Sequence, residues 1–329
     1  MRIPIPFSIF GDRPPYISGI KYLDNAFHWA EKWGLKILID LHTVPGSQNG
    51  FDNGGICGVC KWSTMPDEVE FVLELLEKLA VRYGHREALW GIQPINEPIT
   101  DALTGDISWE QVWVTQTYQA KDPELVKGSA PIKMSFLRQF YLDTYSRVMP
   151  HLAQGRYFVI HDAFRTESWT DFMQDPEYPN VVLDMHFYIA NMELGGVPKI
   201  PEAYIGALQG PLQARMEKMQ QYFPLICGEW CLDNGYIQEQ SDPAEIDRVC
   251  KLLAKVQSNV WNHGSGSFYW IYKMLTTNEK KEYWDLKKCI LHGWMLELSD
   301  KKPMSTGFRK RSDALLRQHR INTKIRIIQ

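Results

Sequence analysis

The chain has 329 residues, of which 44% are hydrophobic and 23% are charged, and its formal net charge is −3. These values are typical of a globular enzyme or binding protein, and the length fits one large domain or two ordinary ones. No apolar run reaches the roughly 18 residues of a membrane-spanning helix, so none is predicted. The small net charge gives no indication of a nucleic-acid partner.

Short apolar runs along the chain are predicted to be β-strands. Their side chains do not alternate between apolar and polar, which is typical of strands that are covered on both faces. In chain order the runs cover residues 2–5, 36–41, 89–96, 157–164, 181–188, 223–230 and 267–273.

Amphipathic segments between these runs are predicted to be helices. Leu23, Ala26, Phe27 and Ala30 recur at i, i+3, i+4 and i+7, and the same spacing recurs from Val69 onward. Further helices are predicted over 136–149, 212–223 and 243–261. This alternation indicates parallel strands joined by crossover helices. A doubly wound sheet is an alternative, but no glycine-rich phosphate loop follows any of the strands.

Polar side chains lie at or near the carboxyl ends of six predicted strands. They are Asp40 and His42, Asn96 and Glu97, His161 and Asp162, His186 and Tyr188, Glu229, and Trp270. In a (β/α)8 barrel these ends form one face, and that face holds the active site. We therefore predict an α/β fold of the TIM-barrel type, with one catalytic domain over residues 1–300.

The predicted barrel has a gap, because seven strands are visible and the fold needs eight. The missing strand would precede residues 2–5, so either the chain lacks an N-terminal segment or another segment fills the gap. The residues after Met1 form no basic and apolar leader, which predicts a cytoplasmic location if Met1 is the natural start. A missing N-terminal segment would instead leave secretion open.

Three other segments stand out. Residues 301–329 hold nine Lys or Arg against one acid, and they are interpreted as a solvated basic extension that could also contact a polyanion or an anionic membrane surface. Residues 43–62 and 99–131 are long connections, and such loops are often walls or lids of a site. Cys57 and Cys60 form a CxxC pair, interpreted as free thiols, with a local disulfide or a zinc site as alternatives.

Glu97 and Glu229 end two of the apolar runs, where a carboxylate without a partner would be costly to bury. Two carboxyl groups at one face suit glycoside hydrolysis, in which one donates a proton and the other attacks the sugar or activates water. A neighbouring negative charge keeps one acid protonated, and surrounding donors keep the other ionised. A separation of about 5–5.5 Å would predict retention, and a wider one would predict inversion.

The sequence resembles glycoside hydrolase family 5, and within it the exo-β-1,3-glucanase-like branch, from Arg2 to about Trp294. The short motif "INEP" is weak alone, whereas "DLHTVPGSQNGFDNGG" is long and specific. The other matching stretches are "RIPI", "YLDNAFHWAEKWGLKILI", "FYLDTY", "HDAF", "DMHFY", "GEW" and "YWIYK", and all occur in the expected order.

The resemblance implies roles for residues around the two glutamates. Glu97 would be the general acid/base and Glu229 the nucleophile. Asn96 would hydrogen-bond the sugar 2-hydroxyl, a contact that strengthens as the oxocarbenium ion forms. Arg2 and Tyr188 would be the donors that keep Glu229 ionised.

Three more residues are implied to line the site. His42 and His186 would support the sugar, and Trp270 would form an aromatic floor beneath it. The resemblance implies neither a cofactor nor a metal ion.

The loop after the second run is implied to contact sugar hydroxyls and to flank the entrance through Phe51, Asp52 and Asn53. The branch clamps the next sugar between two Phe residues, and the position of the second is Asn191 here. This difference, "GGICGVCKW" and the insertion 99–131 all predict a remodelled leaving-group side.

The sequence thus predicts a retaining β-glycosidase of the exo-β-1,3-glucanase or β-glucosidase type, acting on a β-linked oligosaccharide or glucoside. Glucosides with a non-sugar or lipid aglycone are an alternative. A metal-dependent hydrolase is another, drawing on His42, His161 and His186 with Asp40 and Asp162. A third alternative is a catalytically inactive carbohydrate-binding barrel. The oligomeric state is left open.

Overall fold

The computed structural model describes residues 1–276 and 278–295. The chain divides into two compact units, Met1–His186 (unit 1) and a second that begins at Phe187 (unit 2). The predicted basic extension, residues 301–329, lies outside the described residues, and the predicted domain boundary at 300 stays a prediction. No helix of the described residues is both long enough and apolar enough to cross a membrane.

Unit 1 contains five parallel strands, each paired with the next along the chain. They are β1 (Arg2–Pro6), β2 (Ile37–Thr43), β3 (Leu89–Gln93), β4 (Tyr157–His161) and β5 (Val181–His186). Gly91 of β3 lies so close to β4 that a Cβ atom would come within 2.5 Å of the Tyr157 carbonyl oxygen. The predicted parallel pairing is confirmed.

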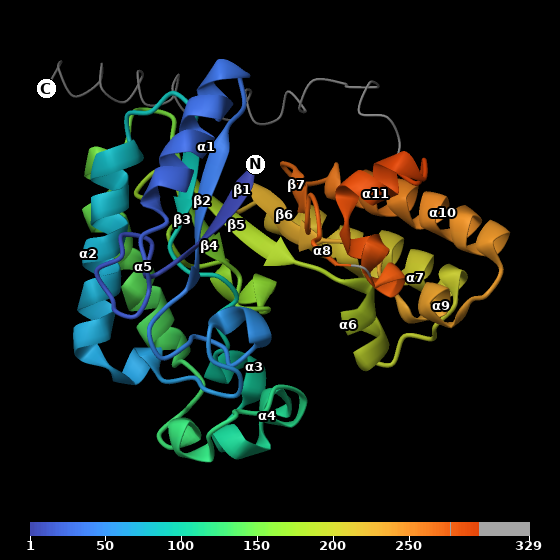
Figure 1. The fold of residues 1–329 in the computed structure, drawn as a ribbon, viewed down its shortest axis with the longest axis horizontal. Helices are drawn as coiled ribbons and strands as arrows, with labels where there is room; N and C mark the ends of the chain where they lie inside the picture. The colour runs from blue at the N-terminus through green and yellow to red at the C-terminus, as the bar shows by residue number, and fades with distance from the viewer. Residues whose placement is uncertain (277, 296–329) are drawn as a thin grey trace, which may run out of the picture. The chain divides into compact units, whose positions relative to one another are not determined.

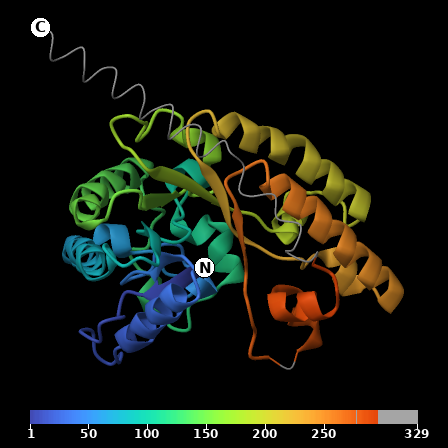
Figure 2. The same ribbon diagram turned by 90° about the horizontal axis from the view of Figure 1, so that it is seen from above.

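Three long helices lie along one side of these strands, as Figures 1 and 2 show. They are α1 (Ile20–Lys32), α2 (Pro66–Tyr83) and α5 (Met134–Val148). The predicted apolar stripe of α1 is buried at Leu23, Phe27 and Ala30. Helix α2 begins at Pro66, whose fixed φ suits a first helical position, and acidic residues in its first turn favour the positive end of the helix dipole.

The two long connections of unit 1 fold against each other. Trp109 Nε1 donates a hydrogen bond of 2.8 Å to the Gly58 carbonyl, and the Cys60 amide donates one of 3.1 Å to Ser129 Oγ. The insertion forms the short elements α3 (Asp101–Thr104), η3 (Trp109–Gln111), α4 (Trp113–Thr117) and η4 (Pro123–Val126). Helices α3 and α4 lie at one end of the unit (Figure 1).

Short turns of 3-10 helix occupy other connections of unit 1. They are η1 (Asp52–Gly54), η2 (Trp62–Thr64), η5 (Met149–His151) and η6 (Thr166–Trp169). Cys57 and Cys60 are free thiols, as interpreted from the sequence. Burial raises the pKa of Cys60, so this thiol stays protonated at neutral pH.

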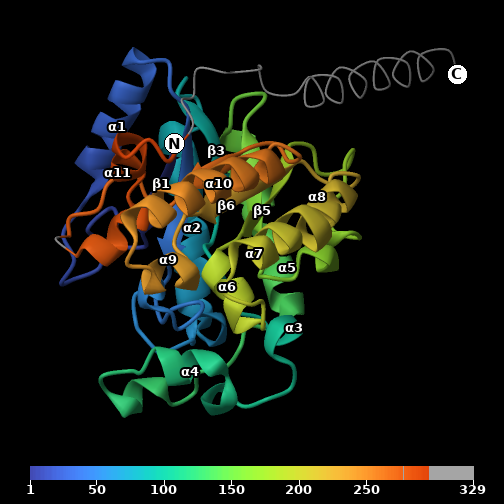
Figure 3. The ribbon, with the colours of Figure 1, turned by 90° about the vertical axis from the view of Figure 1, so that its right-hand side faces the viewer.

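The described part of unit 2 holds two parallel strands, β6 (Leu225–Trp230) and β7 (Ser267–Tyr269). Helix α10 (Pro243–Trp261) crosses the face of the unit in Figure 3, and the Asp242 side chain caps it by accepting from the Ala244 amide. The other helical elements are α6 (Ile189–Leu194), α7 (Pro201–Ala207), η7 (Leu208–Leu212), α8 (Gln213–Met219), α9 (Gly235–Glu239), η8 (Glu279–Trp284) and α11 (Leu286–Leu291).

Several predicted boundaries were too long. Strand β3 ends at Gln93, because Pro94 has no amide to donate to a neighbouring strand. Strand β4 ends at His161, since Ala163 and Phe164 both have positive φ angles. The helix expected to reach residue 223 ends at Met219 and continues as turns.

The contact between α1 and α2 gives a test of the packing. Phe27 is fully buried and stacks on Tyr83 with ring centroids 4.3 Å apart. We expect Phe27→Ala to lower the free energy of unfolding by about 3–5 kcal/mol, because it leaves a cavity under both helices. Trp29→Ala, on the exposed side of the same helix, should change it by no more than about 0.5 kcal/mol. Urea unfolding followed by fluorescence measures both, and equal effects would contradict this packing.

Candidate active site

Glu97 lies just beyond β3 in a backbone conformation that is rare for a residue with a side chain, with φ at +46°. The backbone of the preceding residue, Asn96, is fixed by hydrogen bonds at both its amide and its carbonyl. The Asn96 amide donates to the Leu41 carbonyl at 3.0 Å, and Gln48 Nε2 donates to the Asn96 carbonyl at 2.8 Å. Such strained positions persist only where the neighbouring structure holds them, and they concentrate at functional sites.

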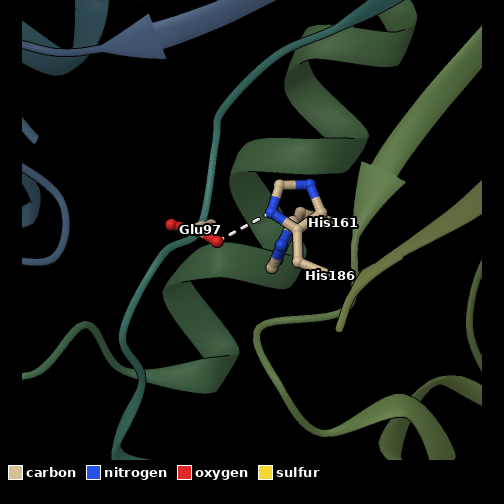
Figure 4. A group of neighbouring side chains, drawn as sticks. All are labelled: Glu97, His161 and His186. Atoms are coloured by element: carbon tan, nitrogen blue, oxygen red, sulfur yellow. Dashed lines mark hydrogen bonds and ion pairs between the residues drawn. The ribbon is translucent and has the colours of Figure 1, made fainter. Parts of the chain in front are cut away.

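The Glu97 carboxyl group is 5% exposed and both of its oxygens are hydrogen-bonded. Oε1 lies 2.7 Å from His186 Nδ1, the contact drawn in Figure 4, and Oε2 accepts from Asn53 Nδ2 at 2.8 Å. Burial favours the neutral acid, but the hydrogen bond and charge of His186, with the Asn53 bond, outweigh it and lower the pKa of Glu97. In the absence of a substrate the carboxyl group is therefore ionised and paired with His186.

His186 is the centre of a buried chain of hydrogen bonds in unit 1. Its Nε2 lies 3.2 Å from Asp184 Oδ2, and that same oxygen accepts from Gln93 Nε2 at 2.7 Å. Gln93 Oε1 in turn accepts from Arg2 Nε at 3.0 Å. This chain fixes the orientation of the imidazole toward Glu97, since both ring nitrogens face carboxylate oxygens.

Arg2 connects this chain to the residue that precedes the acid. Its Nη2 donates to Asn96 Oδ1 at 2.6 Å and lies 3.1 Å from Asp40 Oδ2. The same Asp40 oxygen is 2.7 Å from His42 Nδ1, and His42 Nε2 is 3.5 Å from Asn96 Nδ2. The predicted residues Arg2, His42 and Asn96 therefore meet in one network, while the role of Arg2 toward Glu229 stays a prediction.

His161 lies beside the acid, with its ring edge-on to His186 at a centroid distance of 4.5 Å. Its Nδ1 accepts a hydrogen bond from the Ala163 amide at 3.0 Å, so the neutral ring carries its proton on Nε2. Burial, followed by the charge of His186, lowers the pKa of His161 well below its ordinary value. His161 is therefore a neutral ring packed against a charged one.

Glu97, His161 and His186 are the only described residues whose ligand atoms could together hold a metal ion, all lying within 4.8 Å of one another. A metal needs an unprotonated nitrogen from each imidazole. His186 faces a carboxylate at both nitrogens, and the free nitrogen of His161 already accepts a backbone hydrogen bond. The arrangement thus suits a hydrogen-bonded pair of carboxylate and imidazole better than a metal site. Asp40, His42 and Asp162, which the metal alternative also used, are not part of this group.

Unit 2 supplies the second predicted carboxylate. Glu229 lies in β6, is 2% exposed, and accepts a hydrogen bond of 2.6 Å from the Tyr188 hydroxyl at Oε2. Trp270 follows β7, where its amide donates to the Trp230 carbonyl at 2.8 Å. Trp284 packs on Tyr188 with ring centroids 5.1 Å apart, a supporting contact that the sequence did not indicate.

The loop residues predicted to contact sugar behave differently from one another. Asp52 is exposed, whereas Asn53 donates a hydrogen bond to the Glu97 carboxyl group. Phe51 is 8% exposed, because the rings of Trp113 and Tyr118 each lie 5.6 Å from its own. Its predicted contact with sugar stays a prediction.

Asp184 and Gln93 were missed by the sequence reasoning, although one signal was available for Asp184. It precedes His186 by two residues in β5, so both side chains point to the same face of the strand. Asp40 and His42 repeat this arrangement in β2. An acidic residue two positions before a histidine at the end of a strand therefore predicts a hydrogen bond between the two side chains.

Three comparisons place the chain among known proteins. No family model matches it. Glucan 1,3-beta-glucosidase 1 of Schizosaccharomyces pombe is 34% identical over 318 residues, which cover 89% of this chain and 69% of the relative. The glucan 1,3-beta-glucosidase of Schwanniomyces occidentalis is 25% identical, with coverages of 89% and 68%. The enzyme of that name from Candida oleophila is 35% identical over 57% of this chain, which spans only 40% of that relative.

Solved structures of similar fold include two enzymes that are named for different activities. Rutinosidase from Aspergillus niger superposes with a TM-score of 0.66 at 19% identity, covering 89% of this chain and 77% of that one. Endo-glycoceramidase II from Rhodococcus sp. superposes with a TM-score of 0.51 at 14% identity, covering 83% and 64%. At these identities the similarity shows a shared fold alone.

The lowered pKa of Glu97 predicts how stability depends on pH. Its folded value lies below the ordinary value of about 4.5, so the stabilisation is complete above that pH and is lost as the pH falls below it. We expect the wild type to lose more stability than Glu97→Gln between about pH 5 and about pH 2.5, because only the wild type has this carboxyl group to protonate. Urea midpoints across this range measure the slope, with Glu74→Gln on the exposed side of α2 as the matched control. Identical slopes for all three proteins would contradict the assignment.

Proposed function

Because the chain belongs to the glucan 1,3-β-glucosidase family of glycoside hydrolases, we propose that it hydrolyses β-glucosidic bonds with retention, as an exo-acting β-1,3-glucanase or β-glucosidase. We further propose that the family is glycoside hydrolase family 5 and that the complete fold is a (β/α)8 barrel. The parallel strand–helix order of both units supports this fold. A β-linked glucan or glucoside is the proposed substrate.

Glu97 acts as the general acid/base and Glu229 as the nucleophile in this proposal. In the first step Glu229 attacks the anomeric carbon while Glu97 gives its proton to the departing glycosidic oxygen, so an ester bond forms as the glycosidic bond breaks. In the second step Glu97 takes a proton from water, and the resulting hydroxide displaces Glu229. The Tyr188 hydroxyl stabilises the charge that returns to Glu229.

The single observation that carries the acid/base assignment is the environment of Glu97. A buried carboxyl group on a strained residue is bonded at one oxygen to an imidazole and at the other to an amide. His186 holds the proton before catalysis and can pass it to Glu97 Oε1. Asp184 stabilises the imidazole while it holds that proton. A sugar that excludes water strengthens the effect of burial, which shifts the proton toward Glu97 before bond cleavage.

The remaining predicted residues orient the sugar. Asn96, fixed by Arg2, presents its amide beside His42 and is the proposed partner of the 2-hydroxyl. Trp270 is the proposed floor beneath the ring, since a sugar packs its C–H face on an aromatic surface. Neither role needs a metal ion or a cofactor.

Chemical rescue tests the two carboxylates separately. Glu229→Ala should be inactive on aryl β-glucosides, and azide should restore turnover by giving the inverted α-glucosyl azide. Glu97→Ala should lose about 10²–10⁴-fold in kcat/KM on substrates whose leaving group needs a proton, because only those depend on acid catalysis. It should lose far less on a dinitrophenyl glucoside, and azide should then give the retained β-product. Glu74→Gln serves as the control.

A mechanism-based label identifies the nucleophile directly. A 2-deoxy-2-fluoro glucoside should add one sugar to the protein, and peptide mass spectrometry should place that sugar on Glu229. Wild-type turnover by Glu229→Ala without azide, or a label on another residue, would refute the assignment.

A further inference from the structure

The insertion 99–131 brings aromatic side chains into the neighbourhood of Glu97. Trp113 and Tyr118 both contact the Phe51 ring at 5.6 Å, and the Phe164 ring lies 6.3 Å from the same ring. We call Phe51, Trp113, Tyr118 and Phe164 the insertion cluster. All four lie within unit 1, the unit that holds Glu97.

One series of contacts connects the insertion cluster to the Glu97 carboxyl group through polar side chains. The Phe51 amide donates to Asn49 Oδ1 at 2.9 Å, and Asn49 Nδ2 donates to Asn53 Oδ1 at 3.2 Å. Asn53 then donates to Glu97 Oε2 at 2.8 Å. The position of the cluster is therefore fixed relative to one oxygen of the acid.

A second series reaches the other oxygen through rings. Phe164 packs edge-on to His161 at 5.2 Å, His161 packs edge-on to His186 at 4.5 Å, and His186 Nδ1 lies 2.7 Å from Glu97 Oε1. Two independent series of contacts thus fix the cluster beside the carboxyl group. The Glu97 charge also adds to the effects of burial and of Asp52 in raising the pKa of Tyr118.

Exposure within the cluster differs between its members. Phe51 is 8% exposed, whereas Trp113 is 47% exposed, although tryptophan is highly buried on average. The Gly58 carbonyl holds Trp109 and thereby the helix α4 that carries Trp113. Trp113 is therefore a half-exposed aromatic side chain on a fixed support.

We propose that the exposed part of Trp113, which packs on Phe51, binds the leaving group of the substrate, and that this group carries a flat ring with an apolar face. The inference rests on the proposed function. A general acid gives its proton to the leaving-group oxygen, so a surface fixed beside that acid adjoins the leaving group. A second pyranose and an aryl aglycone share the required chemistry, because both can lay a ring face on an indole.

The test compares leaving groups that differ in having a ring. The three substrates are laminaribiose, 4-methylumbelliferyl β-glucoside and β-glucosyl fluoride, whose leaving group has none. In Trp113→Ala we expect kcat/KM for one or both ring-bearing substrates, relative to the fluoride, to fall about tenfold, the usual size for loss of one apolar contact. Trp113→Phe should recover most of that ratio. The substrate that is affected more identifies the kind of ring that the surface accepts.

Trp29→Ala is the matched control, since Trp29 is an exposed tryptophan of helix α1. It should leave all three values of kcat/KM unchanged. A Trp113→Ala protein whose three values fall by the same factor, or do not fall, would overturn the inference while the proposed function stands. Wild-type protein that hydrolyses none of the three would instead overturn the proposed function, and with it the inference.

Discussion

The hydrogen bond between Glu97 and His186 is the constraint on which the rest of unit 1 depends. It places an acid and a base 2.7 Å apart in a dry environment, where neither could remain charged alone. Three neighbouring side chains stabilise the pair. Asn53 satisfies the second oxygen, Asp184 satisfies the second nitrogen, and the neutral ring of His161 fills the space beside them.

The two long connections join the Glu97 carboxyl group to the insertion 99–131. Residues 43–62 face Glu97 through Asn53 on one side, and they hold the insertion through Gly58 and Cys60 on the other. Most of the bonds that hold the insertion use main-chain atoms. Within α4, Val114 is fully buried whereas Trp113 is half-exposed, so only part of this helix is available for new outer contacts.

The sequence was most informative where a pattern is local. Continuous apolar runs located every strand in the described residues, and polar side chains at their ends located Glu97, Asn96 and His186. Local patterns cannot report which side chains meet across strands. The contact of Asn53 with sugar stays a prediction, and no local pattern indicated that its amide bonds to Glu97. The place of Phe51 at the entrance also stays a prediction, and no local pattern indicated that two rings from a segment some sixty residues later in the chain pack on it.

The alternation of Asp184 and His186 along β5 has a consequence for how this strand can change. Both side chains point to the same face as Val182, whereas Val181, Leu183 and Met185 point to the opposite face. Adding or removing one residue before His186 would turn the imidazole away from Glu97 and bring an apolar side chain in its place. The position of His186 in the strand is thus restricted by its contact with Glu97, since a shift by one residue would exchange the two faces of the strand.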